Sequence, residues 1–149
     1  MIVEFDGDYV FLSNFYPSTI YHDGITYPTN EHFFQAMKTL DIGERKAIAA
    51  AATPGQAKRM GRSIKLRPDW EKVKTDVMME GLRHKFAIPE FRTKLLATGD
   101  EELMEGNTWH DNTWGNCVCQ KCQSTPGRNM LGMLLMELRN EIRYEIANQ

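Results

Sequence analysis

Residues 27–38 read YPTNEHFFQAMK, and this stretch indicates where the first helix begins and which of its faces is buried. Thr29 is a candidate N-cap, because a threonine oxygen accepts a hydrogen bond from an unpaired backbone N–H of the first helical turn. We expect a helix from about Thr29 to Leu40. Phe33, Met37 and Leu40 lie on one face of it and are expected to pack inward.

A second face of the same helix carries Glu31, Gln35 and Lys38, at positions i, i+4 and i+7. One interpretation is a solvated face with ordinary polar surface pairs. The other is a functional role for Glu31, because the backbone N–H groups of a first turn favour an anion and keep a carboxylate ionised. Helical periodicity alone leaves both interpretations open.

A small β element is expected before this helix. The segment TIYHDGITYP has β-favouring residues on both sides of Asp23-Gly24, a dipeptide that supplies positive φ in a two-residue turn. Two short apolar runs, Ile2–Phe5 and Tyr9–Leu12, are expected to add strands beside the hairpin.

Helical patterns dominate the remainder of the chain. The segment GERKAIAAAA is rich in helix formers. Thr53, Pro54 and Gln56 occupy the cap, first and third positions of a helix start. Further helices are expected from about Asp69 and after Pro89.

The last helix is expected from about Asn129 to Ala147. We assign its apolar stripe to the core: Leu131, Leu134, Leu135, Leu138, Ile142 and Ile146. The predicted fold class is therefore mainly α (α+β), a compact single helical domain over residues 1–149 with a small N-terminal β-hairpin element.

Length and charge limit the classes of function. A chain of 149 residues suits one domain with one core. The net charge is 18 − 20 = −2, which argues against a protein that grips a long phosphate backbone. No apolar run reaches about 18 residues, so no membrane span is expected. The N-terminus has three acids among its first eight residues and no basic region, so we expect a cytoplasmic protein.

Three cysteines are crowded into GNCVCQKCQ, at Cys117, Cys119 and Cys122. They are either reduced thiols in a loop or ligands of a soft metal, with a fourth ligand from elsewhere in the chain. His110 or His22 would supply that ligand. The spacing leaves this choice open, and we expect the reaction itself to need no cofactor and no metal.

A polar-aromatic segment, NTWHDNTWGN, spans residues 107–116. Its tryptophans either cover the core or offer a stacking surface for a nucleobase, with Asp111 beside it. The segment GRNMLG that follows leads into the last helix, and backbone N–H groups at a helix start can receive a phosphate.

Eight segments in this order resemble the NADAR family, named for NAD and ADP-ribose: FLSNFYP, PTNEHFFQAMK, MGR, KLRPDW, VKTDVMMEGLRHKF, LLATGDEELMEG, DNTWGN and GRNMLGMLLMELR. The similarity runs from about Phe11 to Arg143. Where many relatives continue directly from tryptophan–glycine into glycine–asparagine, this chain inserts the three-cysteine segment.

The resemblance implies a helical domain that cleaves an N-glycosidic bond to a ribose. It implies two substrate classes: ADP-ribose attached to guanine, and ribosylamino-pyrimidine phosphates of riboflavin synthesis. The alternatives from other classes are a module that binds ADP-ribose or a related nucleotide without cleaving it, and a small zinc protein that binds nucleic acid. The first-turn carboxylate favours the enzyme, and the missing basic stripe disfavours the zinc protein.

Within the enzyme interpretation, Glu31 is expected to stabilise positive charge at the anomeric carbon and to activate water. Asp111 is the second acid, and Lys38 meets a phosphate, protonates the leaving group or forms an imine. The expected substrate-binding residues are Asn14, Phe15, Gln35, Arg62, Trp70, Trp114, Gly115 and Asn129. Trp70 also begins a core stripe, so core packing competes with base stacking there.

Of the two substrate classes, we favour ADP-ribose on guanine. Several separate polar groups are available for a diphosphate, more than one phosphate requires: Asn14, Lys38, Arg62, Arg128 and Asn129. The expected partner is a nucleotide-like ribosylated substrate, with no extended nucleic-acid surface and no membrane.

Overall fold

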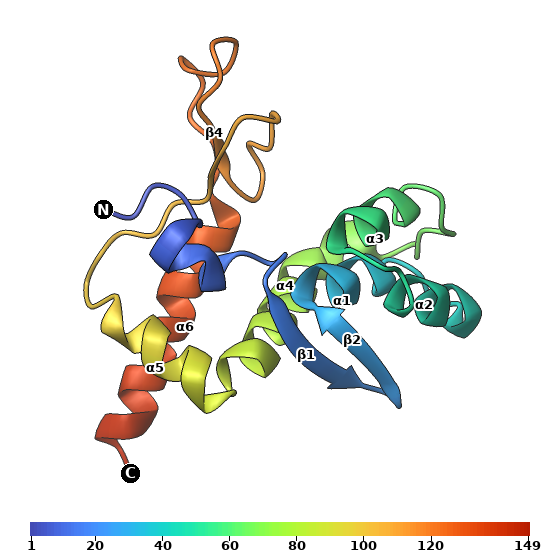
Figure 1. Cartoon of the computed structure of the whole chain (residues 1–149), viewed down its shortest axis with the longest axis horizontal. Helices are drawn as coiled ribbons and strands as arrows, with labels where there is room; N and C mark the ends of the chain where they lie inside the picture. The colour runs from blue at the N-terminus through green and yellow to red at the C-terminus, as the bar shows by residue number, and fades with distance from the viewer. The chain divides into compact units, whose positions relative to one another are not determined.

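The computed structural model describes all 149 residues, and the chain forms two compact units (Figure 1). Unit 1 consists of Met1–Ser13 and Pro89–Gln149, and unit 2 of Asn14–Ile88. Six α-helices, one 3-10 helix and two small two-stranded sheets make up the structure, which confirms the mainly α class with a small β-hairpin. No helix is both long and apolar enough to cross a membrane.

Unit 2 begins with the expected hairpin. Strand β1, Pro17–His22, pairs antiparallel with β2, Ile25–Thr29. The turn residues Asp23 and Gly24 have φ of 50° and 78°, the left-handed conformation that an Asp-Gly turn supplies. The hairpin prediction is confirmed.

Helix α1, Asn30–Ala36, follows β2 without a loop, and Thr29 caps it as predicted by accepting the His32 N–H at 3.1 Å. Phe33 and Met37 are buried, but Leu40 is 59% exposed. The inward position of Leu40 was wrong because the helix ends at Ala36, so the helical face that carries Phe33 does not extend to residue 40.

The other helices of unit 2 surround α1. These are α2 (Ile42–Ala49), α3 (Pro54–Met60) and α4 (Trp70–Phe86). Thr53 caps α3 by accepting the Gln56 N–H, as predicted. Helix α1 packs against all three helices and both strands, so its side chains are placed from several directions at once.

Unit 1 contains the 3-10 helix Gly7–Leu12 (η1), α5 (Pro89–Ala97) and α6 (Met130–Ala147). The expected strands near the N-terminus were wrong. Ile2 makes only one isolated bridge, and residues 7–12 turn into a helix because the positive φ of 54° at Gly7 interrupts an extended path.

Helices α5 and α6 pack together, and Arg139 of α6 donates to Thr98 Oγ1 at 2.8 Å. The apolar stripe of α6 is buried as predicted except for Ile146, which lies in the last turn and is exposed. Between α5 and α6 the chain forms a long loop with one short parallel pair, β3 (Gly106–Asn107) and β4 (Asn116–Cys117).

Candidate active site

The carboxylate of Glu31 lies in the first turn of α1 and is almost fully buried, with the residue only 7% exposed. Its Oε1 accepts a hydrogen bond from Gln35 Nε2 at 2.8 Å. The backbone N–H of Glu31 donates to the carbonyl of Asn14 at 3.1 Å. The interpretation of this face as solvated was therefore wrong, because Glu31 and Gln35 are both buried. A buried carboxylate needs hydrogen-bond partners inside the protein, and Gln35 supplies one.

Gln35 is held in place by the shape of its surroundings. A Cβ atom added to Gly61 would lie 2.0 Å from Gln35 Oε1 and 2.9 Å from its Cδ. Gly61 has ordinary helical angles, φ −61° and ψ −16°, so glycine is needed here for space and not for backbone conformation. The Gln35 amide therefore lies close against the α3 backbone and points its N–H at Glu31.

Lys38 lies within electrostatic reach of this carboxylate and of two further cations. Burial lowers the pKa of Lys38, while the nearby charge of Glu31 raises it. Arg62 and Lys58 lower the pKa of Lys38 further, which requires both to lie within electrostatic reach of it. Unit 2 thus brings together Glu31, Lys38 and Arg62 of the predicted site, and adds Lys58.

Aromatic side chains border the same region. The rings of Phe34 and Trp70 pack with centroids 5.1 Å apart, and Lys38 Nζ lies 5.8 Å from the centroid of Phe34. Trp70 is buried, whereas Phe15 is exposed in the loop before β1. Base stacking on Trp70 stays a prediction, and core packing against Phe34 is the role that the contacts describe.

Asn14 fixes the entry into α1. Its Oδ1 accepts a hydrogen bond from Asn30 Nδ2 at 2.8 Å, and its own Nδ2 lies 3.4 Å from Met78 Sδ. The Asn14 side chain is buried and bonded inside the protein. The contact of Asn14 with the site is made by its backbone carbonyl, which accepts the Glu31 N–H.

In unit 1, Asp111 organises the loop that follows β3. Its Oδ1 accepts the backbone N–H groups of Thr113 at 3.1 Å and Trp114 at 2.9 Å. The side chain of Asn107 bonds to the backbone N–H and carbonyl of Asp111 from the other side. One oxygen of this carboxylate therefore holds a turn, and Trp114 follows directly after it, half-buried.

Gly115 and Asn129 join this loop to the start of α6. A Cβ atom at Gly115 would lie 1.7 Å from Glu105 Oε2, so only glycine fits there. Asn129 has a left-handed φ of 50°, accepts the Glu105 N–H at 3.0 Å and donates to the Leu103 carbonyl at 2.8 Å. Both polar atoms of the Asn129 side chain are thus bonded to backbone.

The predicted site residues divide between the two units. Seven lie in unit 2 and four in unit 1. Those in unit 2 are Asn14, Phe15, Glu31, Gln35, Lys38, Arg62 and Trp70, and those in unit 1 are Asp111, Trp114, Gly115 and Asn129.

Two lysines were missed by sequence reasoning. Lys58 lies in the last turn of α3 and reaches Lys38 electrostatically. Lys85 is fully buried in α4, and burial lowers its pKa to about 7. The sequence did offer a sign that Lys85 is buried: it follows Gly81 by four residues and so lies on the apolar face of α4, where a charged residue is unusual.

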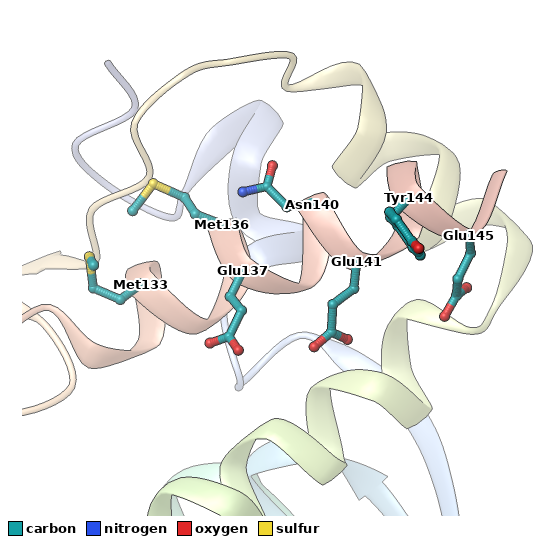
Figure 2. A pocket seen from close by; sticks show the side chains of 7 residues that line it. All are labelled: Met133, Met136, Glu137, Asn140, Glu141, Tyr144 and Glu145. Atoms are coloured by element: carbon teal, nitrogen blue, oxygen red, sulfur yellow. The ribbon is translucent and has the colours of Figure 1, made fainter. Parts of the chain in front are cut away.

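A hollow of about 690 Å³ lies along α6 in unit 1 (Figure 2). Glu137, Glu141 and Glu145 line it at successive turns, together with methionines and Tyr144. Three carboxylates repel an anionic ligand, so this hollow is a poorer candidate for a phosphate-bearing substrate than the surroundings of Glu31.

A buried, oriented carboxylate within electrostatic reach of a lysine is typical of an enzyme that performs acid–base chemistry. The model of the NADAR domain family matches residues 4–143, and the chain belongs to the NADAR family. The resemblance in the sequence motifs is thereby confirmed.

Individual relatives agree with this assignment. N-glycosidase YbiA of Escherichia coli is 45% identical over 141 residues, covering 93% of this chain and 84% of that protein. The NMR structure of E. coli YbiA superimposes with a TM-score of 0.83 at 41% identity, covering all of this chain and 89% of the other. A riboflavin biosynthesis protein of Vibrio vulnificus is 36% identical, over 93% of this chain and 37% of that protein. The chain is an N-glycosidase.

Proposed function

We propose that this N-glycosidase hydrolyses the bond between a ribose and a base, with Glu31 as the catalytic carboxylate. The burial of Glu31 in a helical first turn, with a donor fixed by Gly61 behind it, is the observation that carries the proposal. Gln35 donates a hydrogen bond to this carboxylate, and Lys38 lies within electrostatic reach of it.

The chemistry balances with water as the only co-reactant. The bond from C1′ to the base nitrogen breaks, and its electron pair leaves with the base. The water oxygen adds to C1′, while one water proton passes to the Glu31 carboxylate and on to solvent. The base nitrogen gains a proton. Positive charge develops on the sugar in between, and the fixed negative charge of Glu31 stabilises it.

Lys38 acts in this proposal as a cation that holds a phosphate. Lys58 and Arg62 lie within its electrostatic reach, so a single anion beside them meets several positive charges. Such a grouping is unfavourable in the free protein and favours binding of a phosphate or diphosphate. Asp111, the predicted second acid, stays a prediction, and one oxygen of its carboxylate is already held by its own turn.

The favoured substrate is ADP-ribose attached to guanine, in DNA or in a nucleotide. Its diphosphate carries more negative charge than the single phosphate of a riboflavin intermediate, and Lys38 with the cations near it outnumbers what one phosphate needs. A half-buried Trp114 offers a surface on which a base could stack.

The second candidate is a ribosylamino-pyrimidine phosphate. It is favoured by the names of two relatives: the riboflavin biosynthesis protein of V. vulnificus, and a chloroplastic one of Zea mays. Both substrates present a ribose C1′ bonded to nitrogen, so the same carboxylate chemistry serves either.

A panel of substrates separates the possibilities. The pure protein is incubated with ADP-ribosylated guanine in an oligonucleotide and with the riboflavin intermediates, and released base and sugar are measured by mass spectrometry. The Glu31→Gln variant, purified in the same way, controls for contaminating hydrolases. Release from ADP-ribosylated guanine is expected.

The other outcomes each have a distinct meaning. Cleavage of the riboflavin intermediate alone would overturn the preferred substrate and leave Glu31 chemistry in place. Equal release by wild type and Glu31→Gln would refute the role of Glu31. Tight binding of ADP-ribose with no release from any substrate would support the non-catalytic binding module.

A further inference from the structure

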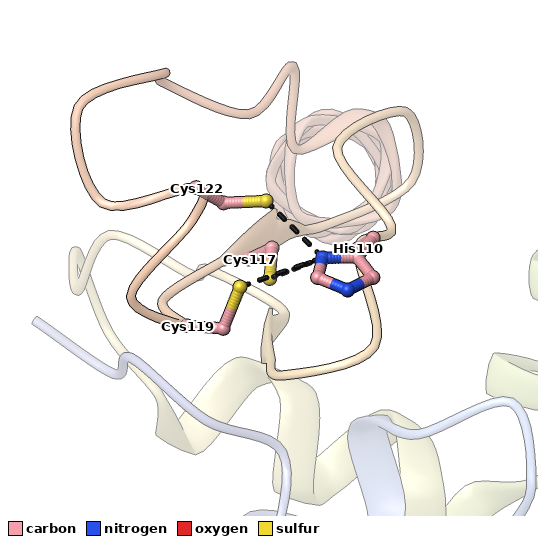
Figure 3. Close-up of side chains that lie close together, drawn as sticks. All are labelled: His110, Cys117, Cys119 and Cys122. Atoms are coloured by element: carbon pink, nitrogen blue, oxygen red, sulfur yellow. Dashed lines mark hydrogen bonds between the residues drawn. The ribbon is translucent and has the colours of Figure 1, made fainter.

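Four potential metal ligands converge in the loop between β3 and α6 (Figure 3). Nδ1 of His110 lies 3.3 Å from Cys122 Sγ, 3.4 Å from Cys119 Sγ and 3.9 Å from Cys117 Sγ. All four ligand atoms lie within 4.8 Å of one another. Figure 3 shows the three thiols and the imidazole nitrogen turned toward a common centre.

These distances match the edges of a tetrahedral zinc site. With Zn–S bonds of about 2.3 Å and Zn–N bonds of about 2.0 Å, tetrahedral angles place nitrogen and sulfur about 3.5 Å apart. The three observed separations, 3.3, 3.4 and 3.9 Å, lie on both sides of that value. A set of one histidine and three cysteines is among the ligand sets that zinc uses in structural sites.

The backbone is shaped to bring the ligands together. His110 has a positive φ of 68°, an uncommon conformation for a non-glycine residue. Cys119 and Cys122 are joined by a tight turn in which the Cys122 N–H donates to the Cys119 carbonyl at 3.0 Å. Cys117 lies in β4, fully buried, with its N–H bonded to Asn112 Oδ1 at 2.8 Å.

We propose that His110, Cys117, Cys119 and Cys122 bind one Zn²⁺ ion. Each thiol loses its proton on binding, and Nδ1 of the neutral imidazole supplies the fourth bond. His22, the other candidate ligand, belongs to unit 2, where its Nδ1 lies 3.5 Å from Glu80 Oε1. The site is closed by four protein ligands and leaves no position for a reacting water, so its role is structural.

The ion would hold the loop that carries part of the predicted site. Between His110 and Cys122 lie Asp111 and Trp114, and the side chain of Asn112 bonds to the Cys117 backbone. Few apolar side chains of residues 108–128 are buried, so this segment has little core of its own. A metal crosslink supplies stability that hydrophobic packing does not provide here.

Metal analysis tests the proposal directly. Protein purified under reducing conditions should contain about one zinc per chain, and removal of the metal with a chelator should lower the melting temperature. Re-addition of cobalt should give the strong visible absorption of a tetrahedral ion together with thiolate-to-metal charge transfer. Cobalt-loaded and zinc-loaded proteins should turn over equally, because the metal does not contact the substrate.

Variants identify the ligands. Cys119→Ser and His110→Ala should each lose metal or bind it weakly, whereas Gln123→Ala, an exposed neighbour in the same loop, should bind one ion as wild type does. A thiol reagent should react with three cysteines in the metal-free protein and with none rapidly in the zinc form.

The proposal would be overturned by wild-type protein that takes up no stoichiometric zinc or cobalt after full reduction. An intact mass lower by two hydrogen atoms in freshly isolated, metal-free protein would likewise overturn it, because it would show that two of the cysteines form a disulfide. Both readouts use the wild-type chain, so poor folding of a variant does not affect them.

Discussion

Replacing Gly61 by alanine should disable the site through Gln35, without touching Glu31. The added methyl would lie 2.0 Å from Gln35 Oε1, about 1.4 Å closer than the 3.4 Å at which ordinary contacts begin. The Gln35 amide must move, and its 2.8 Å hydrogen bond to Glu31 is then lost.

The expected magnitude follows from two opposing effects. Gly61 has helical angles, so alanine alone would stabilise the helix end by up to about 1 kcal/mol. A hydrogen bond to a charged group contributes about 1.5–3 kcal/mol, and overpacking costs about 1–3 kcal/mol. The two costs together exceed the gain, so we expect a net loss of about 1.5–6 kcal/mol in the free energy of unfolding. Turnover should fall by roughly 10- to 100-fold as the carboxylate loses its orientation.

A double-mutant cycle isolates this contact. Urea unfolding and turnover are measured for Gly61→Ala, Gln35→Ala and the double variant. Once Gln35 is truncated, the two nearest atoms are gone and the nearest remaining contact of the new methyl is the Cβ of residue 35, at 3.3 Å, so Gly61→Ala should add little. A coupling energy of at least about 1 kcal/mol is expected.

Gly55→Ala is the matched control in the same helix, because a Cβ there would meet only Thr53 Oγ1 at 3.9 Å. It should leave activity unchanged and leave stability unchanged or slightly raised. Strictly additive effects of the substitutions at positions 35 and 61, or full activity in Gly61→Ala, would refute the proposed contact between these residues.

Three other predictions concern charge and stacking. Lys38→Arg should keep most activity and Lys38→Met should lose at least about 10-fold, since the proposed role is a charge contact. Burial lowers the pKa of Lys38, so wild-type activity should decline with rising pH before the usual lysine range is reached. Lys38→Arg should remove that decline in a pH–rate profile. Trp114→Ala should weaken ADP-ribose binding by roughly 1–3 kcal/mol in calorimetry. Burial lowers the pKa of Lys85 to about 7 in the folded protein. Above that pH the unfolded state binds more protons than the folded state, so the free energy of unfolding should rise between about pH 7 and pH 10. Lys85→Met should flatten this rise in urea unfolding.

Local features were predictable from the sequence. The hairpin follows from Asp23-Gly24, and the starts of α1 and α3 follow from Thr29 and Thr53, because turns and N-caps depend on residues within a few positions of one another. The early end of α1 at Ala36 carries no comparable local marker, and so Leu40 was placed wrongly.

The support behind the candidate carboxylate was not predictable. The contact between Gln35 and Gly61 joins residues from two helices, and nothing in either local sequence requires it. The closeness of Lys58 and Arg62 to Lys38 likewise depends on how α3 packs against α1. The helical period shows which residues share a face, but only tertiary packing shows that this polar face is buried.

The role of Glu31 is tested most directly by single-turnover release of base from ADP-ribosylated guanine by Glu31→Gln. Glu71→Gln is the matched control, because Glu71 also lies in a helical first turn but is exposed and paired with Lys74. Glu31→Gln should fold normally and react at least about 100-fold more slowly, the scale of one positioned acid–base group, with Glu71→Gln at the wild-type rate. A folded Glu31→Gln protein that releases base at the wild-type rate would contradict the assignment.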